Sequence, residues 1–424
     1  MMKHTFVLGL LVAQMSCPMW AITLDECQQL ARDHYPLIKQ YDLIDQANEY
    51  TIANANKGYL PQLSLSAKAT YQSAVPGLPS EMADVLAPMG IEIPEVNKGQ
   101  YQAVLELNQV IWDGQQINAQ KRVAKAGTEE QHQQLEVSLY QLVDRINQLF
   151  IGTLSLQEQL VQNKILTNEL ESQYRFAKAQ QEGGLMMDAD VDLVRIHLLD
   201  AEQNRIKLQS TVKSFKVMLG YFIGRDIQAE ELVRPVPEIA LTALQVMRPE
   251  LGWYASQRAR LEEQRSVVVS KNLPRIGAFA NGGIGEPGLN LLEPGFSPYY
   301  MVGLRLSWNI GALYTLGNDK RMIQNQIDLV DVQEELFRFN TNQAVTQLLN
   351  DIERIKGQMK SDDEIIALRR RIKENTQVQV EHGTLTEYEL MRQVLDEDAA
   401  RQQKVNHEME LLNAIYSLKY MVNN

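Results

Sequence analysis

The chain has 424 residues, enough for two or three ordinary domains, and a formal net charge of −12. This acidic balance argues against a nucleic-acid binder, which normally presents a basic face. No stretch reaches 18 apolar residues, so the sequence predicts no transmembrane helix. An exported chain without such a helix can still span a membrane as a closed β-barrel.

Residues 1–21 have the features of a secretory signal peptide. Lys3 provides a positive start, and the apolar run that follows is too short to span a bilayer. We expect cleavage after Ala21; lipidation at Cys17 is the alternative. Cys27 is the only other cysteine, so the exported chain needs no internal disulfide.

The rest of the chain repeats itself. Leu60-Pro61 and Leu273-Pro274 each open a segment of alternating apolar and polar residues. Further on, the two copies match at a shift of 199 residues: Leu105-Glu106-Leu107 with Leu304-Arg305-Leu306, Lys121-Arg122 with Lys320-Arg321, Gly184 with Gly383, Asp190 with Glu389, and Ala201 with Ala400. Two copies of one unit predict a single duplicated architecture.

Each copy predicts the same elements in the same order. The first repeat, 22–224, contains a helix interrupted near Pro36, a strand pair at 60–112, a long helix at 114–183 and a return helix at 187–222. A linker at 225–244 follows. The second repeat, 245–424, contains a helix, a strand pair at 273–310, a long helix at 317–382 and a return helix at 387–421. At 1.5 Å per residue, each long helix measures about 100 Å.

The strands alternate with a period of two, which favours a sheet with one apolar and one polar face. Leu63, Leu65, Ala67, Ala69 and Tyr71 alternate with Ser64, Ser66, Lys68 and Thr70, and the other strands behave similarly. Each segment has about 11 residues, the length of a tilted membrane strand. Tyr101, Trp112, Tyr299, Tyr300 and Trp308 lie near strand ends, where interfacial aromatic residues belong.

The helices show a different period. Leucine and isoleucine recur in the first long helix with the 4-3 spacing of a coiled-coil seam: Leu135, Leu139, Leu142, Ile146, Leu149, Leu156 and Leu160. Glycine ends both long helices, at Gly183-Gly184 and at Gly383.

Four strands cannot enclose a pore, and their exposed edges invite pairing with further chains. Oligomerisation is therefore expected. Three copies would supply 12 strands, within the range of outer-membrane barrels; two or four copies remain open on this reasoning alone.

This layout resembles the TolC-like outer-membrane efflux and secretion channels of Gram-negative bacteria, over essentially the whole mature chain. The resemblance lies in the start Thr23-Leu24-Asp25-Glu26, the Leu-Pro strand starts, the Leu-x-Leu strand exits, and the turns Gly184-Leu185 with Asp190 and Gly383-Thr384 with Glu389. It implies a mainly α fold with a membrane β-barrel portion. In that fold, three duplicated chains form a 12-stranded barrel in the outer membrane and a periplasmic α-helical tunnel.

The resemblance also implies partners and sites. The chain would self-associate as a homotrimer in outer-membrane lipid and reach an inner-membrane transporter through a periplasmic adaptor protein. The adaptor-contact tips would be Gly183, Gly184, Leu185, Gly383, Thr384 and Leu385, and the periplasmic gate would contain Asp190 and Glu389. Both acids are also typical of a helix N-terminus, and the two roles are compatible.

The sequence departs from the family pattern at the gate. Family members often close the gate with a tyrosine and an arginine that flank the second glycine turn. Val380 and Leu385 stand at those positions here. Closure by apolar packing is the expectation that follows.

No constellation of residues predicts an enzyme, a cofactor or a metal site. The six histidines are scattered without metal-ligand spacing, and each is expected to be solvated. Charged clusters such as Arg369-Arg370-Arg371 and Asp362-Asp363-Glu364 are expected on solvated helix faces.

The function that follows is a passive exit duct for efflux or type I secretion, gated at its periplasmic tip. The alternatives are a periplasmic adaptor or a coiled-coil scaffold without a pore. An adaptor would have a single helical hairpin between soluble β-domains, and a scaffold would need neither the signal peptide nor the alternating strands.

Overall fold

The computed structural model describes residues 21–76, 96–236, 245–290 and 295–423, together with Met82, Ala87–Met89 and Glu293. The predicted signal peptide lies outside the described residues except for Ala21, and so does Cys17. Residues 237–244 of the predicted linker are also outside them.

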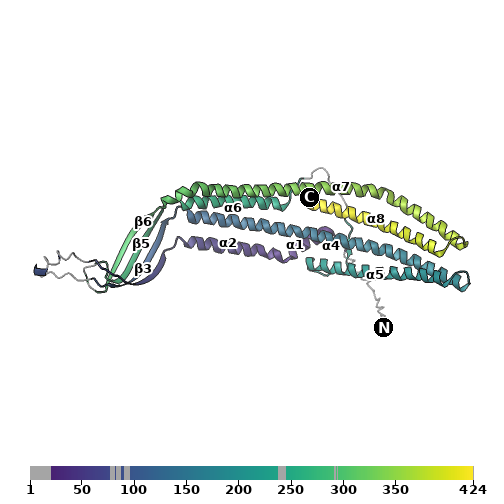
Figure 1. Ribbon diagram of the computed structural model, residues 1–424, viewed down its shortest axis with the longest axis horizontal. Coiled ribbons are helices and arrows are strands. Elements are labelled where there is room, and N and C mark those ends of the chain that lie inside the picture. The colour runs from purple at the N-terminus through teal and green to yellow at the C-terminus, as the bar shows by residue number, and fades with distance from the viewer. Residues whose placement is uncertain are drawn as a thin grey trace, which may run out of the picture. The chain divides into compact units, whose positions relative to one another are not determined.

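Both repeats contain a helix, a strand pair, a long helix and a return helix in this order, and the first repeat has one more helix at its start (Figure 1). The first contains α1 (Leu24–His34), α2 (Gln40–Lys57), β2 (Gln62–Tyr71), β3 (Gly99–Trp112), α4 (Gln116–Glu182) and α5 (Asp188–Ile223). The second contains α6 (Pro249–Lys271), β5 (Arg275–Glu286), β6 (Ser297–Ser307), α7 (Leu313–Glu381) and α8 (Glu387–Val422). The return helices α5 and α8 both have 36 residues. The mainly helical, duplicated architecture is therefore confirmed.

The predicted break near Pro36 has a local cause. Thr23 caps α1, and its side chain and that of Glu26 bond reciprocally to each other's backbone. The helix ends at His34, and Pro36 opens a short 3-10 helix, Pro36–Lys39, before α2 begins. Proline lacks the backbone N–H that would continue the first helix.

The four long strands form one antiparallel sheet in the order β2-β3-β5-β6. The central pair joins β3 of the first repeat to β5 of the second. Leu65 lies opposite Leu105, and Ala278 lies opposite Leu304. Directly opposed residues lie on the same face of the sheet. Because apolar and polar residues alternate along each strand, one face of the sheet is apolar and the other is polar.

The apolar face of this sheet is exposed in the chain. Leu304 retains 74% of its accessible surface, and the exposed set also includes Leu63, Leu65, Val302 and Leu306. A contiguous apolar surface of this kind marks contact with a partner or with lipid. β2 and β6 are the two edge strands of the sheet. Their outer edges pair with no other strand among the described residues.

The chain divides into two compact units, and each unit draws on both repeats. One consists of the described residues of Lys39–Leu135 and Pro249–Leu336 and contains the sheet; the other consists of the described residues of Met1–Ile38, Glu136–Arg248 and Phe337–Asn424. The long helices α4 and α7 contribute their first parts to the unit with the sheet and their remainders to the unit with α5 and α8.

The core of the second of these units follows part of the predicted seam of α4. Leu139, Leu142 and Ile146 are buried, but Leu156 and Leu160 are only half-buried, and Phe150, Ile151 and Leu154 are buried instead. A straight helix with 3.6 residues per turn drifts away from a strict seven-residue repeat, so the buried face moves round the helix. The α4 residues of this core are Leu142, Ile146, Phe150, Ile151 and Leu154, which pack with Leu24 and Cys27 of α1, Leu219 and Ile223 of α5, and Leu412 of α8.

The start of the described chain is attached to the predicted linker. β1 (Ala21–Ile22) pairs in parallel with β4 (Glu231–Leu232), and both Ile22 and Leu232 are buried. The Lys216 ammonium of α5 donates to the backbone carbonyls of Gln228 and Glu230, which holds the turn before β4. Within the described ranges, no helix is both long and apolar enough to cross a membrane.

Candidate functional site

The turn between α4 and α5 contains the first set of predicted tip residues. Gly184 has φ +71°, and the Leu185 N–H donates to the Gln180 carbonyl at 2.9 Å, as in a Schellman-type helix end. A Cβ on Gly184 would meet nothing within 4 Å, so glycine is needed for the backbone conformation and not for space. Leu185 and Met187 project into solvent, with Leu185 80% exposed.

The turn between α7 and α8 repeats this geometry with polar side chains. Gly383 has φ +69°, and the Thr384 N–H donates to the Gln379 carbonyl at 2.9 Å. The Thr384 hydroxyl donates to the same carbonyl. The first turn therefore exposes apolar side chains where the second exposes hydroxyl groups.

The two predicted gate acids have different environments. Asp190, in the first turn of α5, is half-buried. Glu389 is exposed, and its carboxylate accepts hydrogen bonds from the backbone N–H and the hydroxyl of Thr386 in a capping box. Both acids thus lie in the first turn of a helix, where the dipole favours negative charge.

A third acid, Glu387, lies at this site and was not among the predicted residues. Only 3% of its surface is exposed, and burial, followed by the nearby negative charge of Asp190, raises the pKa of the Glu387 carboxyl to about 7. A sequence signal for it exists. Glu387, Leu390, Met391 and Val394 follow the i, i+3, i+4, i+7 spacing of a buried helix face.

Beneath the turns, one apolar cluster joins the two repeats. Leu170 and Ala177 of α4, Val191, Val194 and Leu198 of α5, and Leu390, Met391 and Val394 of α8 are buried together. Val380, at the end of α7, packs against this cluster, and Leu385 is half-buried. Val380 and Leu385, the two residues expected to close the gate by apolar packing, are therefore both partly withdrawn from solvent.

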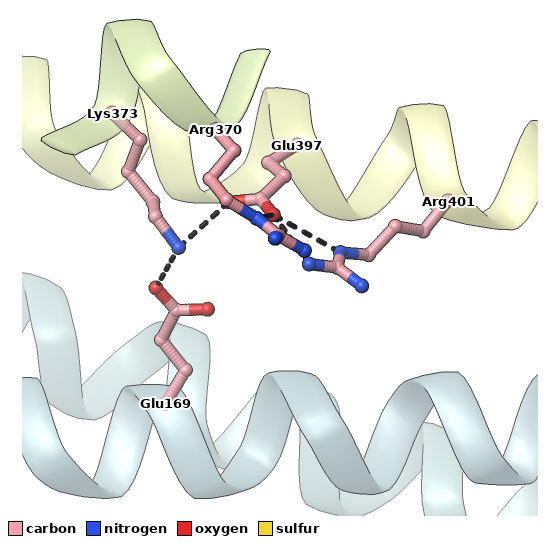
Figure 2. A network of polar contacts seen from close by, with 5 residues as sticks. All are labelled: Glu169, Arg370, Lys373, Glu397 and Arg401. Carbon is pink, nitrogen blue, oxygen red and sulfur yellow. Dashed lines mark hydrogen bonds and ion pairs between the residues drawn. The ribbon is translucent and has the colours of Figure 1, made fainter. Parts of the chain in front are cut away.

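A network of charges lies on the same unit and connects three helices (Figure 2). Glu397 of α8 is 2% exposed and binds Arg401 of α8 at 2.6 Å, Lys373 of α7 at 2.7 Å and Arg370 of α7 at 3.4 Å. Lys373 also binds Glu169 of α4 at 2.5 Å. The network therefore links the first repeat to the second.

The titration of this network follows from its geometry. Burial alone would raise the pKa of Glu397, but hydrogen bonds from Lys373 and Arg401 outweigh burial and keep that pKa below its usual value. Asp398 has no such set of donors. Burial raises the pKa of its carboxyl to about 6 despite the nearby Arg401.

Two expectations about charged side chains are wrong. Asp362 was expected on a solvated face and His407 was expected to be solvated, yet both are buried, with His407 Nδ1 2.9 Å from an Asp362 carboxylate oxygen. Arg370 lies on a solvated face as expected, with 52% of its side chain exposed, although it also contacts the buried Glu397. The reason is tertiary: α8 lies beside α7 (Figure 1), and His407 of α8 meets Asp362 of α7 between the two helices.

Comparisons with known proteins agree with this architecture. The family model described as outer membrane efflux protein matches residues 28–224, which is nearly all of the predicted first repeat. No curated protein sequence matches the chain.

Solved structures share the fold over both repeats. The outer membrane protein VceC from Vibrio cholerae has a TM-score of 0.68 and 11% identity, covering 95% of this chain and 96% of VceC. The CmeC outer membrane channel of Campylobacter jejuni has a TM-score of 0.65 and 13% identity, with coverages of 94% and 85%. The open state of the MtrE outer membrane channel of Neisseria gonorrhoeae has a TM-score of 0.63 and 10% identity, with coverages of 95% and 89%.

Proposed function

We propose that this chain, a TolC-like outer membrane efflux protein by its fold and its first repeat, forms a passive trimeric exit duct. The duct carries substrates from an inner-membrane transporter across the periplasm and the outer membrane, in efflux or in type I secretion. The observation that carries the proposal is the sheet, whose apolar face is exposed and whose two edges have no strand partner among the described residues.

The sheet needs further copies to become a membrane-spanning structure. In hydrocarbon, every strand N–H and C=O must be paired, and only closure achieves this. If β6 of one chain pairs with β2 of the next, three chains close 12 strands. The apolar face then contacts lipid, and the polar face with Lys68, Glu106 and Arg305 lines the lumen.

The two helix turns are the proposed docking surface for a periplasmic adaptor protein. The contact residues are Gly183, Gly184, Leu185, Gly383, Thr384 and Leu385. The exposure of Leu185 and Thr384 supports this assignment, since both project from turns whose backbone geometry is the same. An adaptor would meet an apolar turn and a polar turn alternately around the trimer.

The proposed gate lies just behind these turns. Asp190 and Glu389 would place six carboxylates around the mouth of a trimer, and rings of carboxylates favour cations. The apolar cluster that Val380 contacts supports closure by packing at the same level.

Membrane fractionation tests this function against its alternatives. The full-length chain, expressed in a Gram-negative host, should be recovered from the outer membrane as a trimer that heating dissociates. A monomer released with the soluble periplasmic fraction would refute the duct. That result would favour the alternative, a periplasmic adaptor or a coiled-coil scaffold without a pore.

A further inference from the structure

The buried acid Glu387 stands out from every other acid at the helix turns. It occupies the start of the apolar face of α8 and is 3% exposed. Neither of its carboxylate oxygens has a hydrogen-bond partner among the described residues. A carboxylate held in this way is strongly disfavoured, whereas a neutral carboxyl group is tolerated.

Within the part of the chain that the structure describes, no positive charge nearby compensates the negative charge of an ionised Glu387 carboxylate. Asp190 of α5 acts on Glu387, and its sign is the same. Among the described residues, the other titratable groups at the helix ends are exposed to solvent: Glu182 of α4, Asp188 of α5, Glu381 and His382 at the end of α7, and Tyr388, Glu389 and Arg392 of α8. Burial and the like charge therefore act together in favour of the protonated form.

The repeat provides an internal comparison. Asp188 of α5 stands 199 positions before Glu387 and also opens a return helix. It is exposed and accepts a hydrogen bond from Gln181 at 2.7 Å. The buried acid is thus a feature of the second repeat alone and is not required by the turn geometry that both repeats share.

We propose that Glu387 is a proton-binding site that controls the packing of the two helix turns. With a proton taken from solvent, its neutral carboxyl group keeps the start of α8 packed on the apolar cluster of Val191, Val194, Leu390 and Met391. When it loses that proton, the carboxylate moves towards water, and the start of α8 separates from α5.

The direction of the pH dependence follows from linkage. In the packed form the pKa of Glu387 is about 7, and in the released form it returns to the ordinary value of 4.5. The packed form therefore binds more protons between these two values. Its stability is greatest below pH 4.5 and falls as the pH rises through 7.

Hydrogen exchange of the purified full-length protein in detergent, measured at a series of pH values from 5.5 to 8, tests the proposal. After correction for intrinsic exchange rates, amides of 188–194 and 387–394 should exchange at least about tenfold faster at pH 8 than at pH 5.5. Glu387→Gln should abolish this difference and leave both segments protected, because a glutamine side chain cannot ionise. Asp190→Asn should keep the transition but move its midpoint to lower pH, because the like charge is gone.

The matched control is Asp188→Asn, at the repeat-equivalent and exposed position, which should retain the wild-type transition. Equal protection at pH 5.5 and pH 8 in the wild type, or an unchanged transition in Glu387→Gln, would overturn the proposal. A transition whose midpoint does not move in Asp190→Asn would also contradict it.

The role of this site in opening a duct rests on the proposed function, but the exchange measurement does not. Conductance in planar bilayers at pH 5.5 and pH 8 distinguishes a failure of the proton-binding site from a failure of the duct. A conducting protein with pH-independent exchange would refute the proton-binding site alone. A protein that shows the exchange transition but never conducts would refute the duct alone.

Discussion

Among single residues, Glu397 is the buried centre of a charge network in the second repeat. Its carboxylate is buried and contacts three cationic side chains, and Lys373 extends the contacts to Glu169 of α4 (Figure 2). The contribution of a complete buried ion-pair network to stability differs from the cost of removing one of its members. A complete buried network contributes modestly to stability, but removal of one member leaves its partners desolvated and unpaired.

We expect Glu397→Gln to lower the free energy of unfolding by about 1–3 kcal/mol, because Lys373 and Arg401 lose their buried anion while Lys373 keeps its ion pair with Glu169. The measurement is urea unfolding followed by circular dichroism. Asp363→Asn is the control: its partner is Lys404, its side chain is 82% exposed, and the cost should be less than about 1 kcal/mol. Equal losses in the two variants would contradict a special role for Glu397.

The stability difference between the wild type and Glu397→Gln should depend on pH. The pKa of Glu397 is lowered in the folded chain, so its contribution is complete above the ordinary glutamate value and disappears as the pH falls through the lowered value. The stability difference between the wild type and Glu397→Gln should therefore be constant near pH 7 and shrink below pH 4.5. A difference that grows on acidification would show that the carboxylate is not paired as described.

The charge of the gate acids is testable without loss of structure. Asp190→Asn together with Glu389→Gln should reduce the cation preference in planar bilayers by at least about twofold, since the proposed ring of six carboxylates at the mouth of the proposed trimer would be lost. Glutamine at position 389 preserves the capping box. Glu353→Gln, exposed in the middle of α7, is the control. Unchanged selectivity in the double variant would remove both acids from the pore mouth.

At the scale of elements, the helix turns are defined by backbone conformation. Gly184 and Gly383 adopt positive φ, where an L side chain is strained even when space is free. The side chains that follow them can vary between the repeats because they point into solvent. The two turns therefore share a backbone conformation and differ in the side chains that they expose.

Gly383→Ala should destabilise the chain by about 1–2 kcal/mol, because alanine is strained at φ +69°. Gly357→Ala is the matched change within α7, where an added Cβ also meets nothing within 4 Å. It should instead stabilise the helix by up to about 1 kcal/mol. Urea unfolding of both variants checks the pair, and the same sign of effect in both would refute the argument from φ.

At the scale of the whole molecule, α7 is apolar on two sides. Ile323, Ile327 and Val330 pack with Leu261 of α6, while Met322, Leu329, Val332, Leu336 and Phe339 form an exposed stripe with near-heptad spacing. A helix that is apolar all round is a buried helix. We therefore expect the exposed stripe to be covered by a second copy of the chain in the proposed trimer.

Leu329→Glu should prevent assembly, because it places a charge in the seam between two chains. Asn342→Glu adds the same charge to an exposed position on another side of the same helix, away from the stripe, and should leave the trimer intact. Light scattering after size exclusion in detergent gives the mass of each variant. A trimer of normal stability in Leu329→Glu would place this stripe outside the interface.

The sequence by itself determined the local elements of this protein. The period of two in the strands, the 4-3 spacing in α4, the glycine at each helix turn and the shift of 199 residues are all read from the order of residues, and the first three have a local physical cause. These patterns predicted the duplicated fold and the residues of both helix turns. Where prediction depended on a regular period over many turns, as at Leu156 and Leu160, helical drift displaced the buried face.

Only the tertiary structure decided which charged residues are buried. Glu387, Glu397, Asp362 and His407 all have residue types that normally face water, and each is withdrawn from it because another helix packs over its face. Which helix covers which face depends on contacts between residues far apart in the chain, such as Glu169 with Lys373. The free energy of an ionisable group depends on these neighbours, and the pattern of its own helix does not contain them.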